Sequence, residues 1–288
     1  MIKNISILGT GAMGSRIVKN LLQENYKICI YNRNKNNASE LIELGADYYA
    51  TPAQAVENAD IVISMLSNDE AAKWVWLNSK SGALASMKKN AIAIESSTLS
   101  IACTNQLATA FIKQGIDFLD APVLGSRPQA EGGALIYLVG GKRTTLDNVS
   151  SVLEKLSSAI HYIGENSSGA TMKLAVNAFF GVQVSALCEV IGTLQKSGIN
   201  KQQSIELFNQ LPTTSPALQG IGTLISAENY QPFFPINLVE KDLSYMLNFA
   251  NEVNAETPGI SSTHRSFQLA IEHGFGSDNI SGIAQIFI

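Results

Sequence analysis

Two polar residues stand four positions apart in an apolar helical stretch, and their types suit proton transfer. The stretch GATMKLAVNAFF covers residues 169–180 and holds Lys173 and Asn177. Side chains at i and i+4 share one face of a helix. An ammonium beside a carbonyl under reduction stabilises the charge that develops on oxygen and then supplies the proton. We predict Lys173 as the general acid and Asn177 as the group that holds the lysine or a substrate. The spacing alone equally fits a lysine that snorkels to solvent at a helix end.

A second group of residues has the spacing of a dinucleotide-binding loop. GTGAMG places Gly9, Gly11 and Gly14 in a G-x-G-x-x-G pattern, after an expected strand and at the start of an expected helix. These glycines permit a tight turn, a close approach of pyrophosphate to the backbone, and close packing of helix on sheet. The helix N-terminus attracts the phosphates. We predict that this loop, with Ala12 and Met13, binds a nicotinamide dinucleotide; three turn glycines without a ligand are the alternative.

The residues after the second expected strand indicate which dinucleotide binds. An NAD-preferring domain usually carries an acidic residue about 20 positions beyond the loop, where it binds the adenosine ribose. The chain reads YNRNKNN there, with Asn32 at the position and Arg33 after it. A guanidinium attracts a 2′-phosphate and can stack on adenine. We predict NADPH rather than NADH; a solvated basic turn is the alternative reading of Arg33.

The composition describes a globular chain with a sizeable core and disfavours several classes of function. The 288 residues are 45% hydrophobic and 15% charged, with a net charge of −4 and a pI of about 5.5. A nucleic-acid partner would need a basic face, and no block of like charge occurs, so we predict none. The three cysteines and three histidines show no ligand spacing. We predict no metal site, and buried free thiols in a reducing cytoplasm.

One segment has the length of a membrane span but the wrong composition for one. Residues 174–194 are apolar enough to cross a bilayer, yet they include Asn177, Gln183 and Glu189, which are costly in lipid. The opening MIKNISILGTG has one lysine and a very short apolar run, unlike a signal peptide. We expect a buried helix between domains, no membrane partner and a cytoplasmic location.

The elements that must position these groups follow two different patterns. Strands and helices alternate over residues 1–165, which predicts an α/β, doubly wound Rossmann domain that carries the glycine loop. The expected strands lie at 5–9, 27–32, 60–66, 91–96, 116–121, 134–141 and 160–164. Residues 166–288 show helical patterns, at 168–197, 201–210, 216–226, 238–254 and 259–273. We expect an all-helical substrate and dimerisation domain, joined by the long interdomain helix 168–197, which would line the cleft between the domains.

Four motifs, in order along nearly the whole chain, resemble those of the β-hydroxyacid dehydrogenase family. ILGTGAMG is similar to the family's dinucleotide signature, and DAPVLGSRPQAEGG (120–133) to its substrate loop. GATMKLAVN (169–177) matches its G-x-x-x-K-x-x-x-N catalytic stretch, and KDL (241–243) its late motif. The Asn-Arg pair resembles the NADPH-preferring glyoxylate/succinic semialdehyde reductase branch. The resemblance implies a Rossmann domain, an all-α C-terminal domain, and an NADP(H)-dependent oxidoreductase that interconverts a small β-hydroxyacid and its semialdehyde.

The resemblance also implies roles for individual side chains. Lys173 is similar to the family's catalytic lysine, Asn177 to its helper, and Thr98 to a residue that touches both nicotinamide and substrate. The other implied positions are Met65, Leu66 and Lys241 for the cofactor, and Asp242 and Phe234 for the substrate pocket. Without the family, the last three would be an ordinary surface charge pair and a plain core residue.

One position departs from the family pattern. The family usually reads Asp-Ala-Pro-Val-Ser-Gly, and its serine helps to hold the substrate carboxylate, whereas this chain has Leu124. A carboxylate would then depend on the backbone N–H groups of Leu124, Gly125 and Ser126. Loss of one hydrogen bond to a charged group costs about 1.5–3 kcal/mol. The departure favours a bulkier or less polar substrate than glyoxylate.

Two other functions are alternatives to this one. Imine reductases have the same architecture as the family that this chain resembles, but they generally have tyrosine or aspartate in place of the lysine. Lys173 therefore disfavours imine reduction, while Leu124 mildly favours it. A non-catalytic NADP-binding module is the other alternative, and members of that kind have lost the lysine. The apolar helical domain and the resemblance both favour a homodimer or homotetramer that acts on a small-molecule substrate.

Overall fold

The chain forms two compact units that divide within one long helix. The computed structural model describes residues 4–288. The units are Met1–Lys173 and Leu174–Ile288, whereas the predicted domains meet at 165/166. The helix that contains the division is α8, Ser168–Lys196. In the described part of the chain, α8 is the one helix that could cross a membrane by length and composition, and half of its most apolar window is buried.

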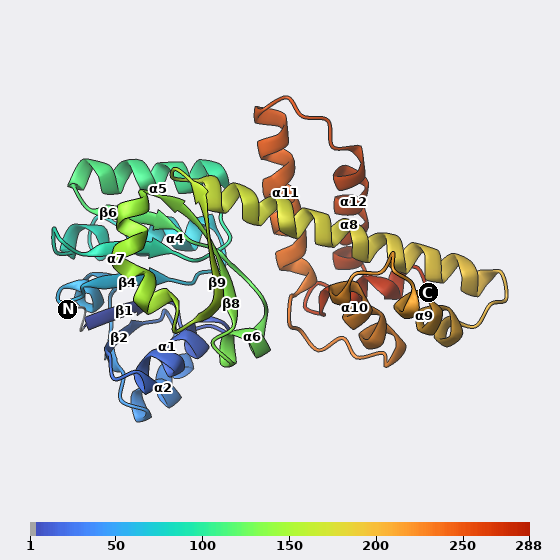
Figure 1. Ribbon diagram of the computed structural model, residues 1–288, viewed down its shortest axis with the longest axis horizontal. Helices are drawn as coiled ribbons and strands as arrows, with labels where there is room; N and C mark the ends of the chain where they lie inside the picture. The colour runs from blue at the N-terminus through green and yellow to red at the C-terminus, as the bar shows by residue number, and fades with distance from the viewer. Residues whose placement is uncertain (1–3) are drawn as a thin grey trace. The chain divides into compact units, whose positions relative to one another are not determined.

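A nine-stranded sheet forms the core of the first unit (Figure 1). Six strands run parallel in the order β3-β2-β1-β4-β5-β6. Their bounds are β1 Asn4–Leu8, β2 Lys27–Tyr31, β3 Asp47–Tyr49, β4 Ile61–Ser64, β5 Ile92–Glu95 and β6 Asp117–Asp120. This order is that of a Rossmann fold, in which the strand order reverses between β1 and β4 and ligands bind outside the carboxyl ends of the strands. The predicted doubly wound sheet is therefore confirmed.

The far edge of the sheet departs from the parallel pattern. β8 (Leu135–Gly141) runs antiparallel to both β6 and the short β7 (Val123–Leu124), and β9 (Ser157–Gly164) pairs in parallel with β8. β6 and β7 pair with β8 in one continuous antiparallel register, so β7 continues the line of β6 and the segment 123–133 lies at the edge where β6 ends. This edge carries the substrate loop predicted from the sequence.

Helices cover both faces of the sheet, because alternate residues of its strands are apolar on each face. One core cluster joins the strands to α1 (Gly14–Gln23), α2 (Ser39–Glu43), α6 (Arg127–Glu131) and α7 (Arg143–Leu153). The other joins them to α3 (Pro52–Val56), α4 (Asp69–Leu77) and α5 (Ile101–Gln114). Figure 1 shows α4 and α5 on one side of the sheet and α1 and α2 on the other. Short 3₁₀ turns at Lys35–Ala38 and Leu84–Ser86 complete the unit.

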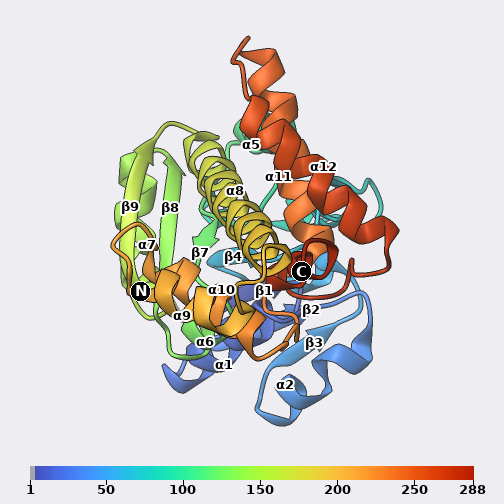
Figure 2. The ribbon, with the colours of Figure 1, turned by 90° about the vertical axis from the view of Figure 1, so that its right-hand side faces the viewer.

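The second unit is helical throughout its described elements. It contains most of α8, then α9 (Lys201–Gln210), α10 (Pro216–Ser226), α11 (Ile236–Glu252), α12 (Pro258–Glu272) and a 3₁₀ segment, Ile280–Ile286. α11 and α12 pack side by side, as both ribbon views show (Figure 2). Their apolar faces meet those of α8, α9, α10 and the C-terminal segment in one core. The predicted all-helical character is confirmed.

Candidate active site

The glycine loop has the geometry of a phosphate cradle. Gly9 follows β1 with a φ of 101°, and a Cβ built on it would lie 2.4 Å from the backbone oxygen of Met65. A Cβ on Gly14 would lie 2.0 Å from the Gly9 oxygen, so both positions exclude any side chain. Gly11 faces open space, and Met13, at the start of α1, places no side-chain cap over the first N–H groups. These N–H groups and the open backbone suit a pyrophosphate.

The end of β2 is held against this loop by an amide. Asn32 Oδ1 accepts the Thr10 N–H at 3.1 Å, and Asn32 Nδ2 donates to the Asn34 carbonyl at 2.8 Å. The adenosine-ribose position therefore carries no negative charge. Arg33 beside it is exposed and makes no hydrogen bond or ion pair with the residues that the structure describes.

A buried carboxylate connects the loops that follow β4 and β5. Glu95 is 1% exposed; its Oε2 accepts the Trp76 indole N–H at 2.7 Å, and its Oε1 accepts the Ser97 N–H at 2.9 Å. The Ser97 hydroxyl accepts the Leu66 N–H at 2.7 Å, which ties the two loops together. Burial raises the pKa of Glu95 more than these hydrogen bonds lower it. Through Ser97, Glu95 thus helps to fix the backbone at Leu66, one of the predicted cofactor-contact positions.

The predicted substrate loop ends in a capped helical turn. Gly125 has a φ of 107°, which favours glycine, and Ser126 precedes α6. The Ser126 N–H donates a hydrogen bond to Gln129 Oε1 at 2.9 Å, as part of a capping box. Of the three backbone donors predicted for a carboxylate, the one at Ser126 is therefore already occupied by Gln129.

The first turn of α8 is fixed to the sheet through a second buried carboxylate. Asp120, at the end of β6, is 1% exposed and accepts the N–H groups of Ser167 at 2.7 Å and Ala170 at 2.9 Å. Burial raises the pKa of Asp120 to about 6. A Cβ on Gly169 would lie 2.4 Å from a backbone oxygen of β8, so only glycine permits this close packing. Lys173, which is half-buried, lies one helical turn further along α8. The G-x-x-x-K spacing therefore sets the position of the lysine relative to the sheet.

Asn177 is hydrogen-bonded to a carboxylate of the second unit. Its Nδ2 donates to Asp242 Oδ2 at 2.6 Å, in the core of the second unit. Asp242 Oδ1 lies 2.9 Å from the Lys241 ammonium, which also lies 4.8 Å from the centre of the Tyr245 ring. The Asp242 side chain is 3% exposed and that of Lys241 is 17% exposed. This pair is buried, and the alternative of an ordinary surface pair is wrong.

Phe234 precedes α11 in a segment held by one buried amide. It is half-buried and packs against the helical core. Asn279 Oδ1 accepts the N–H groups of Phe233 at 3.2 Å and of Phe234 at 2.9 Å. Asn279 Nδ2 in turn donates to the Ser281 hydroxyl at 2.9 Å. Asn279 therefore orients the backbone of the predicted pocket residue.

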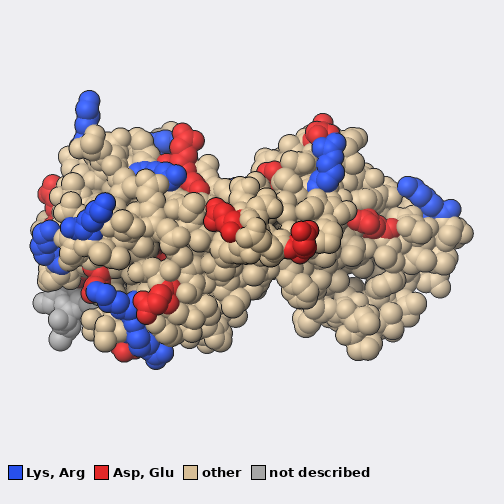
Figure 3. Space-filling model, turned by 90° about the horizontal axis from the view of Figure 1, so that it is seen from above, with Lys and Arg blue, Asp and Glu red and all other residues tan. Residues whose placement is uncertain are grey.

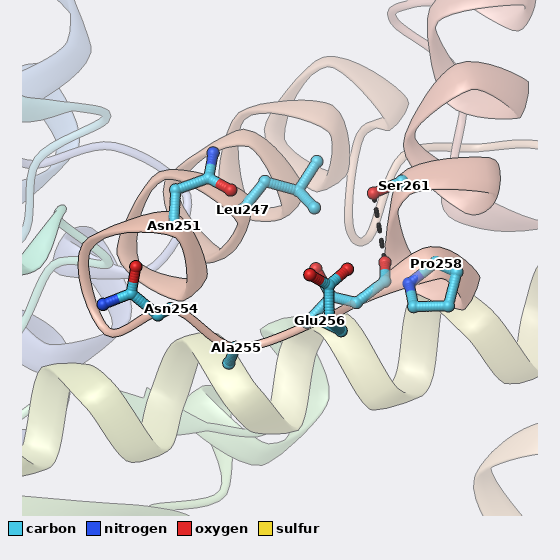
Figure 4. A pocket seen from close by; sticks show the side chains of 8 residues that line it. Leu247, Asn251, Asn254, Ala255, Glu256, Pro258 and Ser261 are labelled. Atoms are coloured by element: carbon cyan, nitrogen blue, oxygen red, sulfur yellow. Dashed lines mark hydrogen bonds between the residues drawn. The ribbon is translucent and has the colours of Figure 1, made fainter.

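A hollow elsewhere in the second unit involves none of the predicted residues. It has a volume of about 400 Å³ and lies at the turn between α11 and α12. Figure 4 shows Asn251, Asn254 and Glu256 around it, with the Ser261 hydroxyl donating to a backbone oxygen of that turn. Most of its lining side chains are exposed. Among the described residues on the face in Figure 3, cationic and anionic side chains are interspersed.

Comparison with known families assigns both units. Residues 4–164 match the model of the NAD-binding domain of 6-phosphogluconate dehydrogenase. Residues 167–287 match that of the NAD-binding domain of NADP-dependent 3-hydroxyisobutyrate dehydrogenase. The chain belongs to the β-hydroxyacid dehydrogenase family. With these matches, it is an NAD(P)-dependent oxidoreductase.

Individual relatives extend over almost the full length of this β-hydroxyacid dehydrogenase. It is 33% identical over 274 residues to the uncharacterised oxidoreductase YfjR of Bacillus subtilis. The matched region covers 94% of this chain and 95% of that protein. It is 28% identical over 281 residues to glyoxylate/succinic semialdehyde reductase 1 of Arabidopsis thaliana, covering 98% and 97%.

Solved structures agree with the fold. The Mycobacterium tuberculosis 3-hydroxyisobutyrate dehydrogenase has a TM-score of 0.90 at 23% identity and covers 99% of each chain. An imine reductase from Pseudomonas sp. has a TM-score of 0.63 at 18% identity, also with 99% of each chain covered. At these identities the similarity shows the shared fold alone.

Within this β-hydroxyacid dehydrogenase the predicted residues fall into two groups. In the first unit, the positions at the carboxyl ends of the strands are Gly9, Gly11, Ala12, Met13, Gly14, Asn32, Arg33, Met65, Leu66, Thr98, Leu124, Gly125 and Ser126. In the second, Asn177, Phe234, Lys241 and Asp242 lie on or beside α8 and α11. Lys173, on α8, is the last residue of the first unit. The positioning roles of Glu95, Asp120 and Asn279 were not predicted from the sequence. Their only sequence signal was a polar residue at the end of an apolar strand or segment.

Proposed function

We propose that this protein interconverts a small β-hydroxyacid and its semialdehyde with NADP(H), and that Lys173 is its general acid and base. One observation carries the proposal: Lys173 follows the first turn of α8, which Asp120 and Gly169 hold against the sheet that bears the dinucleotide loop. A residue held in this way has the fixed position that a proton donor needs.

The side chains divide the work of the proposed reaction. Bound NADPH supplies the hydride. Lys173 gives its proton to the oxygen of the carbonyl as negative charge develops there, and takes it back in the oxidative direction. Thr98 contacts the reacting part of the substrate. Asn177 keeps Asp242 in place through the 2.6 Å hydrogen bond, so that the carboxylate and Lys241 present a fixed polar pair.

Support for NADPH over NADH comes from the end of β2. The amide of Asn32 places no carboxylate near a 2′-phosphate, and the exposed Arg33 next to it supplies positive charge.

Substrate assays with NADPH test the proposal. We expect turnover with succinic semialdehyde and other small semialdehydes. The second candidate is imine reduction, which Leu124 favours because it replaces a hydroxyl with an apolar group. A cyclic imine assayed in parallel separates the two activities. Faster reduction of the imine than of every semialdehyde would contradict the proposed function, and NADPH binding without turnover of either would indicate a non-catalytic module.

We also propose that the protein works in the cytoplasm as a homodimer or homotetramer, without nucleic-acid or membrane partners. The apolar side chain of Phe179, 69% exposed on α8, supports self-association. Light scattering of the purified chain tests this assembly, and a monomeric mass at micromolar concentration would contradict it.

A further inference from the structure

The substrate loop contains one guanidinium, that of Arg127, which forms no ion pair with the residues that the structure describes. Arg127 is the first residue of α6, and its side chain is half-buried. Its Nε is shut off from solvent and has no hydrogen-bond partner among residues 4–288. Arg143 and Arg265, by contrast, form ion pairs with Asp147 and Glu272 on the surface. An arginine that cannot be deprotonated and is partly desolvated needs an acceptor, and a planar carboxylate matches its paired donors best.

Contacts within the first unit fix the position of α6, which begins with Arg127. α6 is held on α1 by the hydrogen bond from Asn20 Nδ2 to the Ala130 carbonyl at 2.8 Å, and by the approach of Arg16 to Glu131 at 3.8 Å. Because α1 starts from the glycine loop, α6 lies beside the dinucleotide-binding element. Arg127 is therefore part of the unit that carries the dinucleotide loop.

The loop around Arg127 offers a carboxylate little else. Leu124 has no hydroxyl, and the Ser126 N–H is donated to Gln129. The expected compensation by three backbone donors thus loses the one at Ser126, and Leu124 is itself paired with Ile136 of β8. A cation three residues beyond Leu124 can supply a stronger donor than the missing one, since charge-assisted hydrogen bonds are stronger than neutral ones.

We propose that Arg127 binds the carboxylate that the β-hydroxyacid and its semialdehyde carry. This inference rests on the proposed function and names a residue of this chain that would recognise its substrates. It reverses the expectation that Leu124 selects a less polar substrate. Arg127 is a specificity residue: it acts on the bound carboxylate and takes no part in proton transfer.

The test compares one charged and one uncharged aldehyde of equal chain length. The substrates are succinic semialdehyde and butyraldehyde, and the variant is Arg127→Gln, with Arg143→Gln on α7 as the matched surface control. We expect Arg127→Gln to lower the ratio of kcat/KM for the two substrates by at least about tenfold, through KM, because a hydrogen bond to a charged group is lost. Butyraldehyde turnover and the Kd for NADPH should stay within about twofold of wild type. Arg127→Lys should recover part of the ratio.

Three results would overturn the inference. The first is an unchanged ratio in a folded Arg127→Gln enzyme. The second is an equal loss with both aldehydes together with weaker NADPH binding, which would assign the guanidinium to a cofactor phosphate. The third is no turnover of any aldehyde by wild type, together with equal succinate binding to wild type and Arg127→Gln in calorimetry with NADP⁺ present. If wild type turned over no aldehyde but succinate binding were lost in Arg127→Gln, the proposed function alone would fail.

Discussion

Single residues at the site are set by partners that are remote in sequence. Asn177 holds Asp242, 65 positions away, and Asp120 holds Ala170, 50 positions away. A four-residue spacing identified Lys173 and Asn177 as neighbours on a helix, but it could not reveal that the amide faces a carboxylate from α11. The same limit applies to Glu95, whose indole and backbone partners lie in other loops. Helical periodicity reports a shared face and carries no information about what that face meets.

Replacing the proposed acid should separate binding from chemistry. In Lys173→Ala we expect turnover to fall by at least about 10²-fold, because a positioned proton donor contributes about 10²–10⁴-fold. The Kd for NADPH, followed by fluorescence, should be unchanged. Lys196→Ala, in the last turn of the same helix, is the control and should keep wild-type turnover. Full activity in Lys173→Ala would remove the proposed mechanism.

The cofactor preference should depend on Arg33. Arg33→Ala removes the charge available to a 2′-phosphate, so we expect KM for NADPH to rise by about 10-fold or more, with little effect on NADH. Asn32→Asp adds a carboxylate that can bind the ribose hydroxyls and should shift the preference further toward NADH. Steady-state kinetics with both cofactors measures the change. Equal use of the two cofactors by wild type would contradict the assignment.

Secondary-structure elements were predicted well where their patterns are long. The predicted helices 201–210 and 216–226 coincide with α9 and α10, and 168–197 exceeds α8 by one residue. The three-residue β3 and two-residue β7 were not predicted. β7 exists because its backbone pairs with Tyr137 and Ile136 of β8, a contact that a two-residue pattern cannot reveal. The 3₁₀ segment Ile280–Ile286 was also missed, because its apolar residues lack the 3.6-residue period.

The attachment of α8 to β6 should depend on pH through Asp120. Its pKa is raised from 3.8 to about 6, so folding favours the protonated form. Its contribution to stability is full below pH 3.8 and is lost as pH rises through 6. Relative to Asp120→Asn, which cannot titrate, wild type should gain about 1 kcal/mol in unfolding free energy when pH falls from 7 to 5. Urea unfolding at the two pH values measures the difference.

The variant also has a constant cost that the same experiment separates. An asparagine has one acceptor oxygen for the two N–H groups of Ser167 and Ala170, so Asp120→Asn should be less stable by about 1–3 kcal/mol at pH 7. The difference in unfolding free energy between wild type and Asp120→Asn should then widen toward pH 5. A gap that narrows over this interval would show that the ionised carboxylate is the stabilising form.

At the scale of the whole molecule, the two units have separate cores and different classes of structure. The α/β and all-helical halves were predicted from the change in pattern near residue 165. The position of the division within α8 was not, because a continuous helical pattern gives no sign of where the packing partner changes. Most of the proposed cofactor contacts belong to the first unit.

Cofactor binding should therefore stabilise the first unit most. At a concentration of 100 times Kd, NADPH should add about 2.7 kcal/mol to its unfolding free energy and raise its Tm by about 5–10 °C. Differential scanning calorimetry with and without NADPH measures the shift, and Lys173→Ala should retain it. Absence of any shift with saturating NADPH would contradict binding at the glycine loop.

The continuity of α8 across the two units limits how the gene can be recombined. In a chimaera joined at residue 165, the first turn of α8 would come from another protein. That protein would have to supply a glycine at position 169 and backbone N–H groups placed to donate hydrogen bonds to Asp120. A crossover within the helix, after Lys173, takes the strand ends of the first unit, Asp120 and the lysine all from the same parent protein. Exchange of substrate-binding halves between relatives should therefore succeed more often with the later junction.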